Sequence, residues 1–176
     1  TIDAIDIQTF NGFIDDLFAA RKVYIMGVKS AAPLAQFMGY YLSFILDNVS
    51  VVSTLLLDVY ESMIRIGKED LCIGISFPRY STRTAEALTF AKSRQAKVVA
   101  ITDSRFSPIA EIAQNTLIAK SDMASFADSL AAPLSLINAI IVAASLHNRD
   151  EVYECFNQLE GIWKTHNVYT SAREQK

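Results

Sequence analysis

The sequence predicts a three-layer α/β/α sandwich built on a five-stranded parallel sheet, with further helices at the C-terminal end. Two observations support this fold class. Short apolar runs, typical of buried strands, alternate with longer segments whose apolar residues recur every three to four positions, the period of an amphipathic helix. Strands that alternate with helices form parallel sheets whose two faces are both covered by helices.

The elements follow one another in a regular order. Five strands are predicted, over residues 23–26, 50–56, 71–75, 97–101 and 116–119. Helices are predicted over residues 1–21, 30–45, 59–66, 81–91 and 108–113. Ser30 and Ser107 are expected N-caps, because a serine hydroxyl accepts a hydrogen bond from a free N–H group of the first turn. Pro33 and Pro108 follow them in first turns, where proline is tolerated.

The chain after the fifth strand is predicted to be helical. One apolar face of a helix over about 126–146 carries Phe126, Leu130, Leu134, Ile137, Ile141 and Ala144. Leu136, Ile140 and Val142 add a second apolar surface, which either the final helix, over about 150–164, or a partner subunit must cover. We predict a single domain over 1–176, divided into an N-terminal helix (1–21), an α/β core (22–119), C-terminal helices (120–165) and a tail (166–176).

Composition excludes several classes of function. The 176 residues are 51% hydrophobic, enough for one core, and the net charge of −3 leaves no basic stripe for nucleic acid. Cys72 and Cys155 are too far apart in sequence to predict a zinc site or a disulfide framework. Aspartates interrupt the first apolar segment, and polar residues interrupt the 126–146 helix, so neither a signal peptide nor a membrane span is expected. We expect a cytoplasmic protein without metal or cofactor.

Hydroxyl and basic residues follow two of the predicted strands. The first strand continues into Gly27-Val28-Lys29-Ser30, and the third into Ser76-Phe77-Pro78-Arg79-Tyr80-Ser81. At the carboxyl ends of parallel strands, helix N-termini direct free N–H groups and a positive dipole at an anion. The predicted anion site therefore comprises Gly27, Lys29, Ser30, Ser76, Arg79 and Ser81. The alternatives are simple N-capping for the two helix-start serines and solvated charge for the cations, and the exit 102–105 is interpreted as an ordinary turn.

The order of these motifs resembles a known family. GVKSA, followed by DLCIGISFPRYSTRTAEALTFAKSRQAKVVAITDSRFSPIAEIAQNTLIA, is similar to the sugar isomerase (SIS) domain, in which a Ser-x-Ser-Gly-x-Thr loop binds a sugar phosphate. The resemblance covers about 21–119 and implies a flavodoxin-like sheet. Aligned on Ala91-Lys92, Ser76 matches the first serine of the motif and Ser81 the threonine, while Ser30 matches a phosphate-contacting serine.

The chain departs from this pattern at three positions. Pro78 and Arg79 replace the second serine and the glycine of the loop, and Val28 stands where many members have glycine. The replacement removes one hydroxyl and one backbone N–H, but it adds a guanidinium suited to phosphate or carboxylate. We therefore expect the site to favour an anion still.

A narrower resemblance points to regulation. The loop Ser-Phe-Pro-Arg-Tyr-Ser and the segment SDMASFADSLAAPLSLINAIIVA resemble the effector domains of RpiR-type transcriptional regulators, which carry a helix-turn-helix domain before the SIS domain. Only one predicted helix precedes Val23 here, too little for a DNA-reading unit. The expectation is a phosphosugar-binding sensor domain that forms a homodimer, in part through the 126–146 helix, and binds no nucleic acid by itself.

Two other functions remain open from the sequence. Some SIS domains isomerise aldose and ketose phosphates, which requires a positioned base, usually Glu or His. His147, His166, Glu86 and Glu111 all have ordinary surface or helix-end interpretations, so we assign no catalytic residue. The third possibility is an interaction module that has lost ligand binding, which the substitution at Pro78-Arg79 would favour.

Overall fold

The predicted α/β architecture is confirmed by one parallel sheet. The computed structural model describes residues 6–52, 58–121 and 129–169. The strands are β1 (Val23–Gly27), β2 (Val49–Val52), β3 (Leu71–Ile75), β4 (Lys97–Thr102) and β5 (Asn115–Ile118). They pair in the order β2-β1-β3-β4-β5, all parallel. This is the flavodoxin-like order, in which the chain reverses its direction of progress across the sheet between β1 and β3.

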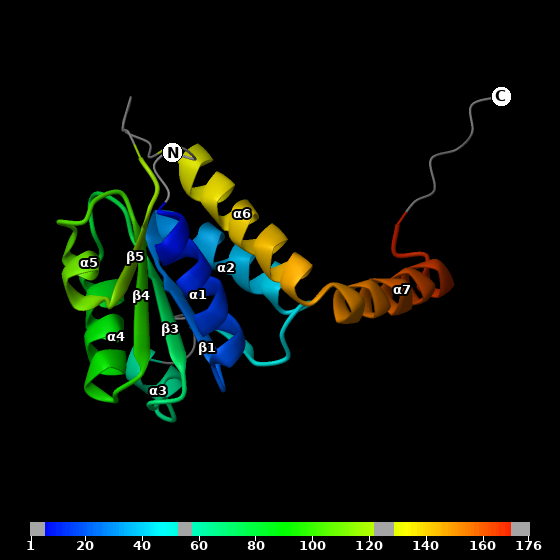
Figure 1. Cartoon of the computed structure of the whole chain (residues 1–176), viewed down its shortest axis with the longest axis horizontal. Helices are drawn as coiled ribbons and strands as arrows, with labels where there is room; N and C mark the ends of the chain where they lie inside the picture. The colour runs from blue at the N-terminus through cyan, green and yellow to red at the C-terminus, as the bar shows by residue number, and fades with distance from the viewer. Residues whose placement is uncertain (1–5, 53–57, 122–128, 170–176) are drawn as a thin grey trace.

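Helices cover both faces of the sheet (Figure 1). They are α1 (Ile7–Ala19), α2 (Ala32–Leu42), α3 (Val59–Ser62), α4 (Thr82–Ser93), α5 (Pro108–Ile112), α6 (Ala131–His147) and α7 (Arg149–His166), with a short 3₁₀ turn, η2 (Lys29–Ala31), before α2. Apolar side chains of α1, α2 and α6 form one buried cluster with the sheet, and apolar side chains of α3, α4 and α5 form another.

The two clusters exist because successive side chains of a strand point to opposite faces. Ile25 and Ile73 belong to the cluster beneath α1, α2 and α6, whereas Met26 and Cys72 belong to the cluster beneath α3, α4 and α5. Every residue of β1 and β3 is buried, as expected for the central strands of a covered parallel sheet. The three-layer arrangement therefore follows from the continuous apolar runs of these strands.

Some predicted boundaries differ from the structure. The strand predicted over 50–56 begins at Val49, and its residues 53–56 lie outside the described part of the chain. The helix predicted over 59–66 ends at Ser62, and turns follow it. The helix predicted from residue 126 is α6, which begins at Ala131, and 122–128 are likewise outside the described residues.

α6 packs its first apolar surface and two of the three residues of its second one within the chain. Leu136 and Ile140 are 1% and 0% exposed and lie in the cluster formed with α1 and α2. The prediction that these two residues form a face for another helix or for a partner subunit was therefore wrong. Val142, by contrast, is 56% exposed.

α7 leaves the body of the molecule (Figure 1). It bends by 101° from α6, and none of its residues is buried. The alternative considered from the sequence, that the final helix covers α6, is thereby excluded. Within the described residues no single helix has the length and apolarity to cross a membrane; α6 and α7 meet that criterion only when taken together across their bend.

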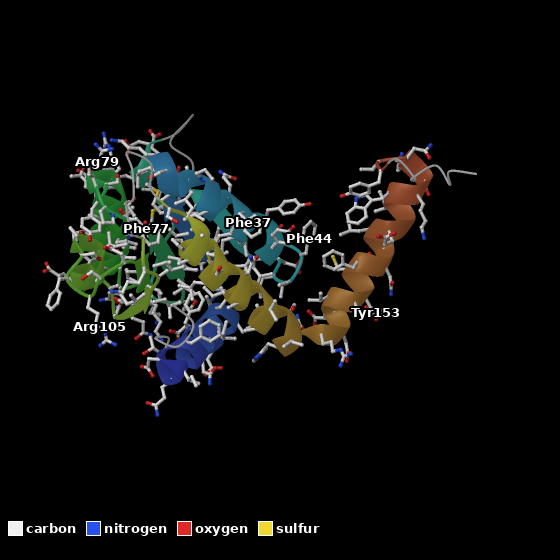
Figure 2. All side chains as sticks on the ribbon, turned by 90° about the horizontal axis from the view of Figure 1, so that it is seen from above. Phe37, Phe44, Phe77, Arg79, Arg105 and Tyr153 are labelled. Atoms are coloured by element: carbon white, nitrogen blue, oxygen red, sulfur yellow. The ribbon has the colours of Figure 1, made fainter. Side chains whose placement is uncertain are left out.

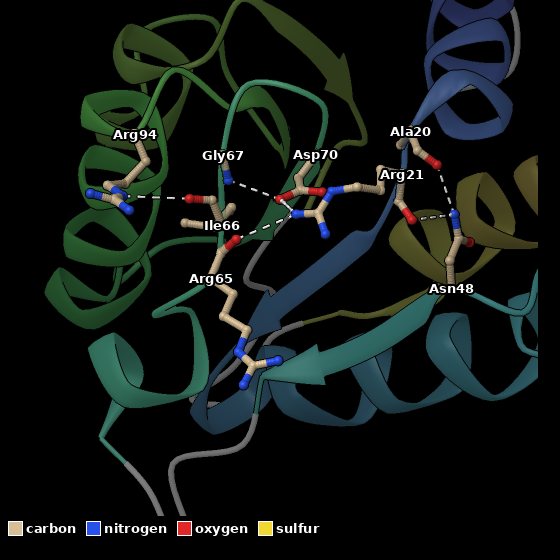
Figure 3. A network of polar contacts seen from close by, with 8 residues as sticks. All are labelled: Ala20, Arg21, Asn48, Arg65, Ile66, Gly67, Asp70 and Arg94. Carbon is tan, nitrogen blue, oxygen red and sulfur yellow. Dashed lines mark hydrogen bonds and ion pairs between the residues drawn. The ribbon is translucent and has the colours of Figure 1, made fainter.

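A network of polar contacts closes the amino-terminal edge of the sheet (Figure 3). The buried carboxylate of Asp70 forms an ion pair with Arg21 at 2.7 Å and accepts a 2.8 Å hydrogen bond from the Gly67 N–H. The Asn48 amide donates to the Ala20 carbonyl at 2.7 Å. These contacts tie together the segments that precede β1, β2 and β3, so this edge is a structural clamp; among the described residues, Asp70 Oδ1 and Asn48 Oδ1 are buried without a hydrogen-bond partner.

Candidate anion-binding site

The predicted site residues lie at the carboxyl-terminal edge of the sheet, opposite this clamp. β1 and β3 are direct neighbours, and their last residues, Gly27 and Ile75, are register partners. The segments that follow, 28–31 and 76–81, therefore start side by side. Ligands of open α/β sheets bind outside the carboxyl ends of the strands where the strand order reverses, and in this sheet that position lies between β1 and β3.

The turn after β1 is tight and leaves two polar side chains in solvent. A Cβ on Gly27 would lie 2.8 Å from the Ala31 carbonyl oxygen, so only glycine fits beneath the turn. Lys29 has a φ of 54°, in the left-handed region that non-glycine residues seldom occupy. Lys29 and Ser30 are exposed. Ser30 is not the N-cap predicted from the sequence: it lies inside η2, and Ala31 occupies the cap of α2.

In the loop after β3, the first residue, Ser76, forms a hydrogen bond with the last residue, Ser81. Ser76 is 3% exposed, and its Oγ accepts a 3.1 Å hydrogen bond from the Ser81 N–H. A hydroxyl also carries one hydrogen to donate. Ser76 therefore shapes the loop as an acceptor while keeping a donor for an anion.

α4 begins without a side-chain cap. Ser81 has the extended conformation of an N-cap residue, yet its side chain forms no capping hydrogen bond, and the first turn holds no acidic residue. The first backbone bond of the helix runs from the Ala85 N–H to the Ser81 carbonyl, so the N–H groups of 82–84 precede the intrahelical ladder. The helix start thus keeps its positive character and a hydroxyl that can turn to a ligand.

Ser107 is a side-chain N-cap, the alternative role that the sequence left open for Ser81. Its Oγ accepts a 3.3 Å hydrogen bond from the Ala110 N–H at the start of α5, and the residue is fully buried. The prediction of an N-cap is confirmed there. Ser81 is chemically identical and occupies the same helix position, but its hydroxyl is not used in this way.

Tyr80 fastens the loop to the neighbouring strand end. Its hydroxyl donates a 2.9 Å hydrogen bond to Asp103 Oδ1, and Thr102 Oγ1 donates to the same oxygen at 3.2 Å. Burial, followed by the bond to the Asp103 carboxylate, raises the pKa of Tyr80 to about 12. The segment 102–105 was interpreted from sequence as an ordinary turn. Phe106 N–H bonding to Ser104 Oγ fits that interpretation, but the role of Asp103 was missed.

The positive charge of the site is accessible. Arg79 projects at the exposed end of the loop (Figure 2), and neither Arg79 nor Lys29 forms an ion pair among the residues described. Thr84, in the first turn of α4, has a buried hydroxyl that finds no partner within the same residues. The arrangement offers hydroxyl and backbone donors together with two cations, which suits an anion rather than a metal; the described residues contain no metal-ligand cluster.

The candidate bases for isomerisation lie elsewhere or are paired. His147 stacks on Phe18, with ring centroids 4.1 Å apart, close to the end of α1 that leads into the amino-terminal edge of the sheet. His166 is exposed at the far end of α7, and Glu111 is exposed in α5. Glu86 forms an exposed ion pair with Arg83 at 3.2 Å.

The fold is an α/β domain with a candidate anion site at the carboxyl ends of its strands. Comparison with protein families makes the class specific, because the SIS domain matches residues 16–143. The chain belongs to the SIS domain family. The resemblance noted in its sequence is thereby confirmed.

Individual relatives include transcriptional regulators. An uncharacterized HTH-type transcriptional regulator of Haemophilus influenzae is 29% identical over 118 residues, which are 67% of this chain and 41% of that protein. The chain thus spans less than half of the curated relative it matches. The sugar isomerase domain of an RpiR transcription factor from Sphaerobacter thermophilus is similar in structure, with a TM-score of 0.85, 21% identity, and coverage of 90% of this chain and 89% of that one.

Other similar structures extend the range of the fold. The Vibrio vulnificus NanR protein in complex with ManNAc-6P has a TM-score of 0.79 and 18% identity, covering 92% of this chain and 63% of that one. A Methanococcus jannaschii protein, inferred from its structure to be a 3-hexulose-6-phosphate isomerase, has a TM-score of 0.58 and 17% identity, covering 87% and 78%. The fold is thus shared by regulators and by a protein assigned as an enzyme.

Proposed function

We propose that this chain is the sugar-phosphate-binding sensor domain of an RpiR-type transcriptional regulator. The observation that carries the proposal is the uncapped start of α4, where Ser81 and Ser76 leave hydroxyl donors beside free N–H groups at the β1/β3 edge. A phosphoryl group presents the charge and acceptor oxygens that such a helix start favours. The similar NanR protein, which binds ManNAc-6P, supports a phosphosugar as the ligand class.

The two cations complete the proposed site. Pro78 and Arg79 together replace the serine and glycine of the usual family loop, and the Arg79 guanidinium can form bidentate bonds with phosphate or carboxylate. Lys29 adds a point charge from the turn after β1. In this arrangement the phosphate sits against Ser30, Ser76 and Ser81.

The regulatory part of the proposal concerns the protein to which this domain belongs. The HTH-type relative extends well beyond the matched region, and DNA reading would fall to a separate helix-turn-helix domain. The sensor domain itself has a net charge of −3 and supplies the ligand-dependent signal. In a gel shift at low salt, the chain alone should not retain an operator fragment.

Sugar-phosphate isomerisation is the second candidate. Its support is the shared fold of the Methanococcus jannaschii protein. Among the described residues, however, the base candidates named from the sequence do not offer a free base at the Ser76–Ser81 loop. His147 stacks on Phe18, and Glu86 forms an ion pair with Arg83. A sensor requires only binding, whereas an isomerase requires a base within hydrogen-bond reach of the substrate carbon.

A single experiment separates these functions. The chain is titrated by calorimetry with a panel of aldose and ketose phosphates, and each mixture is then followed by NMR for interconversion. The proposal predicts saturable one-site binding to at least one phosphosugar with no turnover. Turnover would establish the isomerase, and absence of binding across the panel would favour an interaction module that has lost its ligand.

A further inference from the structure

The loop that carries the candidate anion site is tied to the neighbouring strand at two points. At its first residue, the Ser76 N–H donates a 3.2 Å hydrogen bond to the Ile101 carbonyl of β4. Near its other end, the Tyr80 hydroxyl donates a 2.9 Å hydrogen bond to Asp103 Oδ1, just beyond β4. Among the described residues, this is the only side-chain hydrogen bond that the stretch 77–80 forms. Asp103 therefore anchors the part of the loop that lies directly before α4.

Asp103 is itself held by the end of β4. It follows Thr102, the last residue of the strand, and Thr102 Oγ1 donates to the same carboxylate oxygen at 3.2 Å. Thr102 is fully buried, and its carbonyl accepts a 2.8 Å hydrogen bond from the Ala119 N–H, just after β5. The carboxylate thus belongs to the sheet, whereas the phenol of Tyr80 belongs to the loop.

The charge of Asp103 by itself opposes anion binding. Like charges repel, and this carboxylate lies one side chain away from the loop that the proposed phosphate would contact. The bond to Tyr80 gives the carboxylate a role that offsets this repulsion, since a charged acceptor forms a stronger hydrogen bond than a neutral one. Burial, followed by this bond, raises the pKa of Tyr80 to about 12, so the phenol keeps the proton that it donates.

The tie also bears on the two residues at which this loop departs from the family pattern. Pro78 and Arg79 stand where the family loop has a serine and a glycine, and Arg79 is exposed. The residue before this pair, Phe77, is 5% exposed and lies in the apolar cluster formed with α1, α2 and α6. The residue after it, Tyr80, is bound to Asp103. Side chains on both sides of Pro78-Arg79 therefore fix the path of the loop.

We propose that Asp103 is a positioning residue of the anion site: through Tyr80 it holds the loop in the conformation that binds the ligand. The inference rests on the proposed function, because it concerns the same site, and it adds a residue that acts without touching the ligand. A loop that is already ordered loses less conformational entropy on binding. By linkage, a contact that tightens ligand binding is itself tightened when the ligand binds. Occupancy of the site should therefore stabilise the Tyr80–Asp103 bond and the closed loop.

Substitutions at both ends of the bond test the proposal, with inorganic phosphate as the probe and amide NMR shifts as the measurement. Tyr80→Phe removes the donor and Asp103→Ala removes the acceptor, and each should weaken phosphate binding about three- to tenfold, the range expected for one hydrogen bond. The double variant should bind no more weakly than Tyr80→Phe alone, because the two changes remove one interaction. Tyr153→Phe, at an exposed phenol of α7, is the matched control and should bind phosphate as the wild type does.

Asp103→Asn separates positioning from charge. The amide oxygen of asparagine still accepts a hydrogen bond from Tyr80, but the negative charge is gone. If Asp103 positions the loop, Asp103→Asn should match or exceed the affinity of the wild type, whereas Asp103→Ala should bind more weakly. If Asp103 acted only as a charge near the site, both variants would bind phosphate more tightly than the wild type, and the proposal would be wrong.

Hydrogen exchange reports the closed loop directly. The Ser81 N–H, which is bonded to Ser76 Oγ, should exchange faster in Tyr80→Phe and Asp103→Ala than in the wild type, and phosphate should slow its exchange in the wild type. Amides of β3 should exchange equally in all of these proteins. Full phosphate affinity or unchanged Ser81 exchange in folded Tyr80→Phe would overturn the inference and leave the proposed function standing. A wild-type chain whose amides do not respond to phosphate would instead overturn the proposed function, and this inference with it.

Discussion

At the scale of single residues, the candidate site depends on which hydroxyls are already engaged. Ser81 and Ser107 are both N-cap residues, but only Ser107 caps its helix with its side chain. The sequence alone does not distinguish them, since both precede helices at the carboxyl edge of the sheet. The difference arises in three dimensions, because the Ser81 backbone N–H is bound by Ser76 from the start of the same loop.

The two serines should therefore respond oppositely to alanine. Ser81→Ala removes a donor to a charged ligand and should weaken sugar-phosphate binding by about 1.5–3 kcal/mol, with little change in stability. Ser107→Ala removes a cap and should lower the free energy of unfolding by about 0.5–2 kcal/mol, with little change in affinity. Calorimetry and urea unfolding on both variants check this. Loss of stability without loss of affinity in Ser81→Ala would make it an ordinary cap.

Tyr80 gives a prediction in pH. The tyrosine ionises near pH 10 in an unfolded chain, and its pKa is raised to about 12 in the folded one. Between these values the folded state holds a proton that the unfolded state has lost, so the stability contributed by Tyr80 is complete below about pH 10 and disappears as pH rises through about 12.

Urea unfolding of wild type and Tyr80→Phe from pH 9 to 12 isolates this contribution. The variant should be less stable at pH 9, because it lacks the hydrogen bond to Asp103, and the difference should shrink steadily above pH 10. Tyr24, whose pKa is also raised by burial, titrates in both proteins and cancels. A stability difference that does not vary with pH would mean that the Tyr80–Asp103 bond does not form as described.

At the scale of elements, most of the sheet could be predicted and the turns could not. β1, β3 and β4 fall within one residue of their predicted bounds, because buried parallel strands are short apolar runs ended by glycine or polar residues. η2 was missed because Ser30 followed by Pro33 has the composition of a helix start. The left-handed Lys29, which carries the chain into η2, leaves no signal in composition.

Gly27 tests whether this turn shapes the site. Gly27→Ala would place a methyl group against the Ala31 carbonyl oxygen, a backbone atom that cannot move without displacing η2. We expect lower stability and at least tenfold weaker sugar-phosphate binding. Gly12, inside α1 with open space around it, is the matched control, and Gly12→Ala should raise stability by about 0.5–1 kcal/mol at unchanged affinity. Calorimetry measures the affinity of each variant, and urea unfolding measures its stability. Unaltered sugar-phosphate binding by Gly27→Ala would mean that this turn does not shape the site.

α7 marks the limit of prediction at this scale. Its apolar stripe was recognisable from the sequence, and so was the need of α6 for cover. The stripe does not specify its partner, however, and α1 and α2 already cover Leu136 and Ile140. Which apolar surfaces meet is decided by the three-dimensional path of the chain, here by the 101° bend after α6.

At the scale of the whole molecule, strand order brings the two site segments together. Residues 28–31 and 76–81 are far apart in sequence, and they meet because β1 and β3 are neighbours with β2 outside them. The family resemblance predicted that these two segments lie together. The alternation of strands and helices alone did not, because it is compatible with other strand orders. The amino-terminal edge holds the structural Arg21–Asp70 pair, and the proposed ligand site lies at the opposite edge of the same sheet.

In the proposed function, the carboxyl edge of this sheet recognises a phosphoryl group. The most direct measurement is paired calorimetry with a hexose phosphate identified by the panel and with the same hexose lacking the phosphate, on wild type and on Ser76→Ala/Ser81→Ala. We expect saturable binding of the phosphorylated sugar only, with affinity reduced at least tenfold in the double variant. Equal binding of both sugars, or full affinity in a folded double variant, would contradict it.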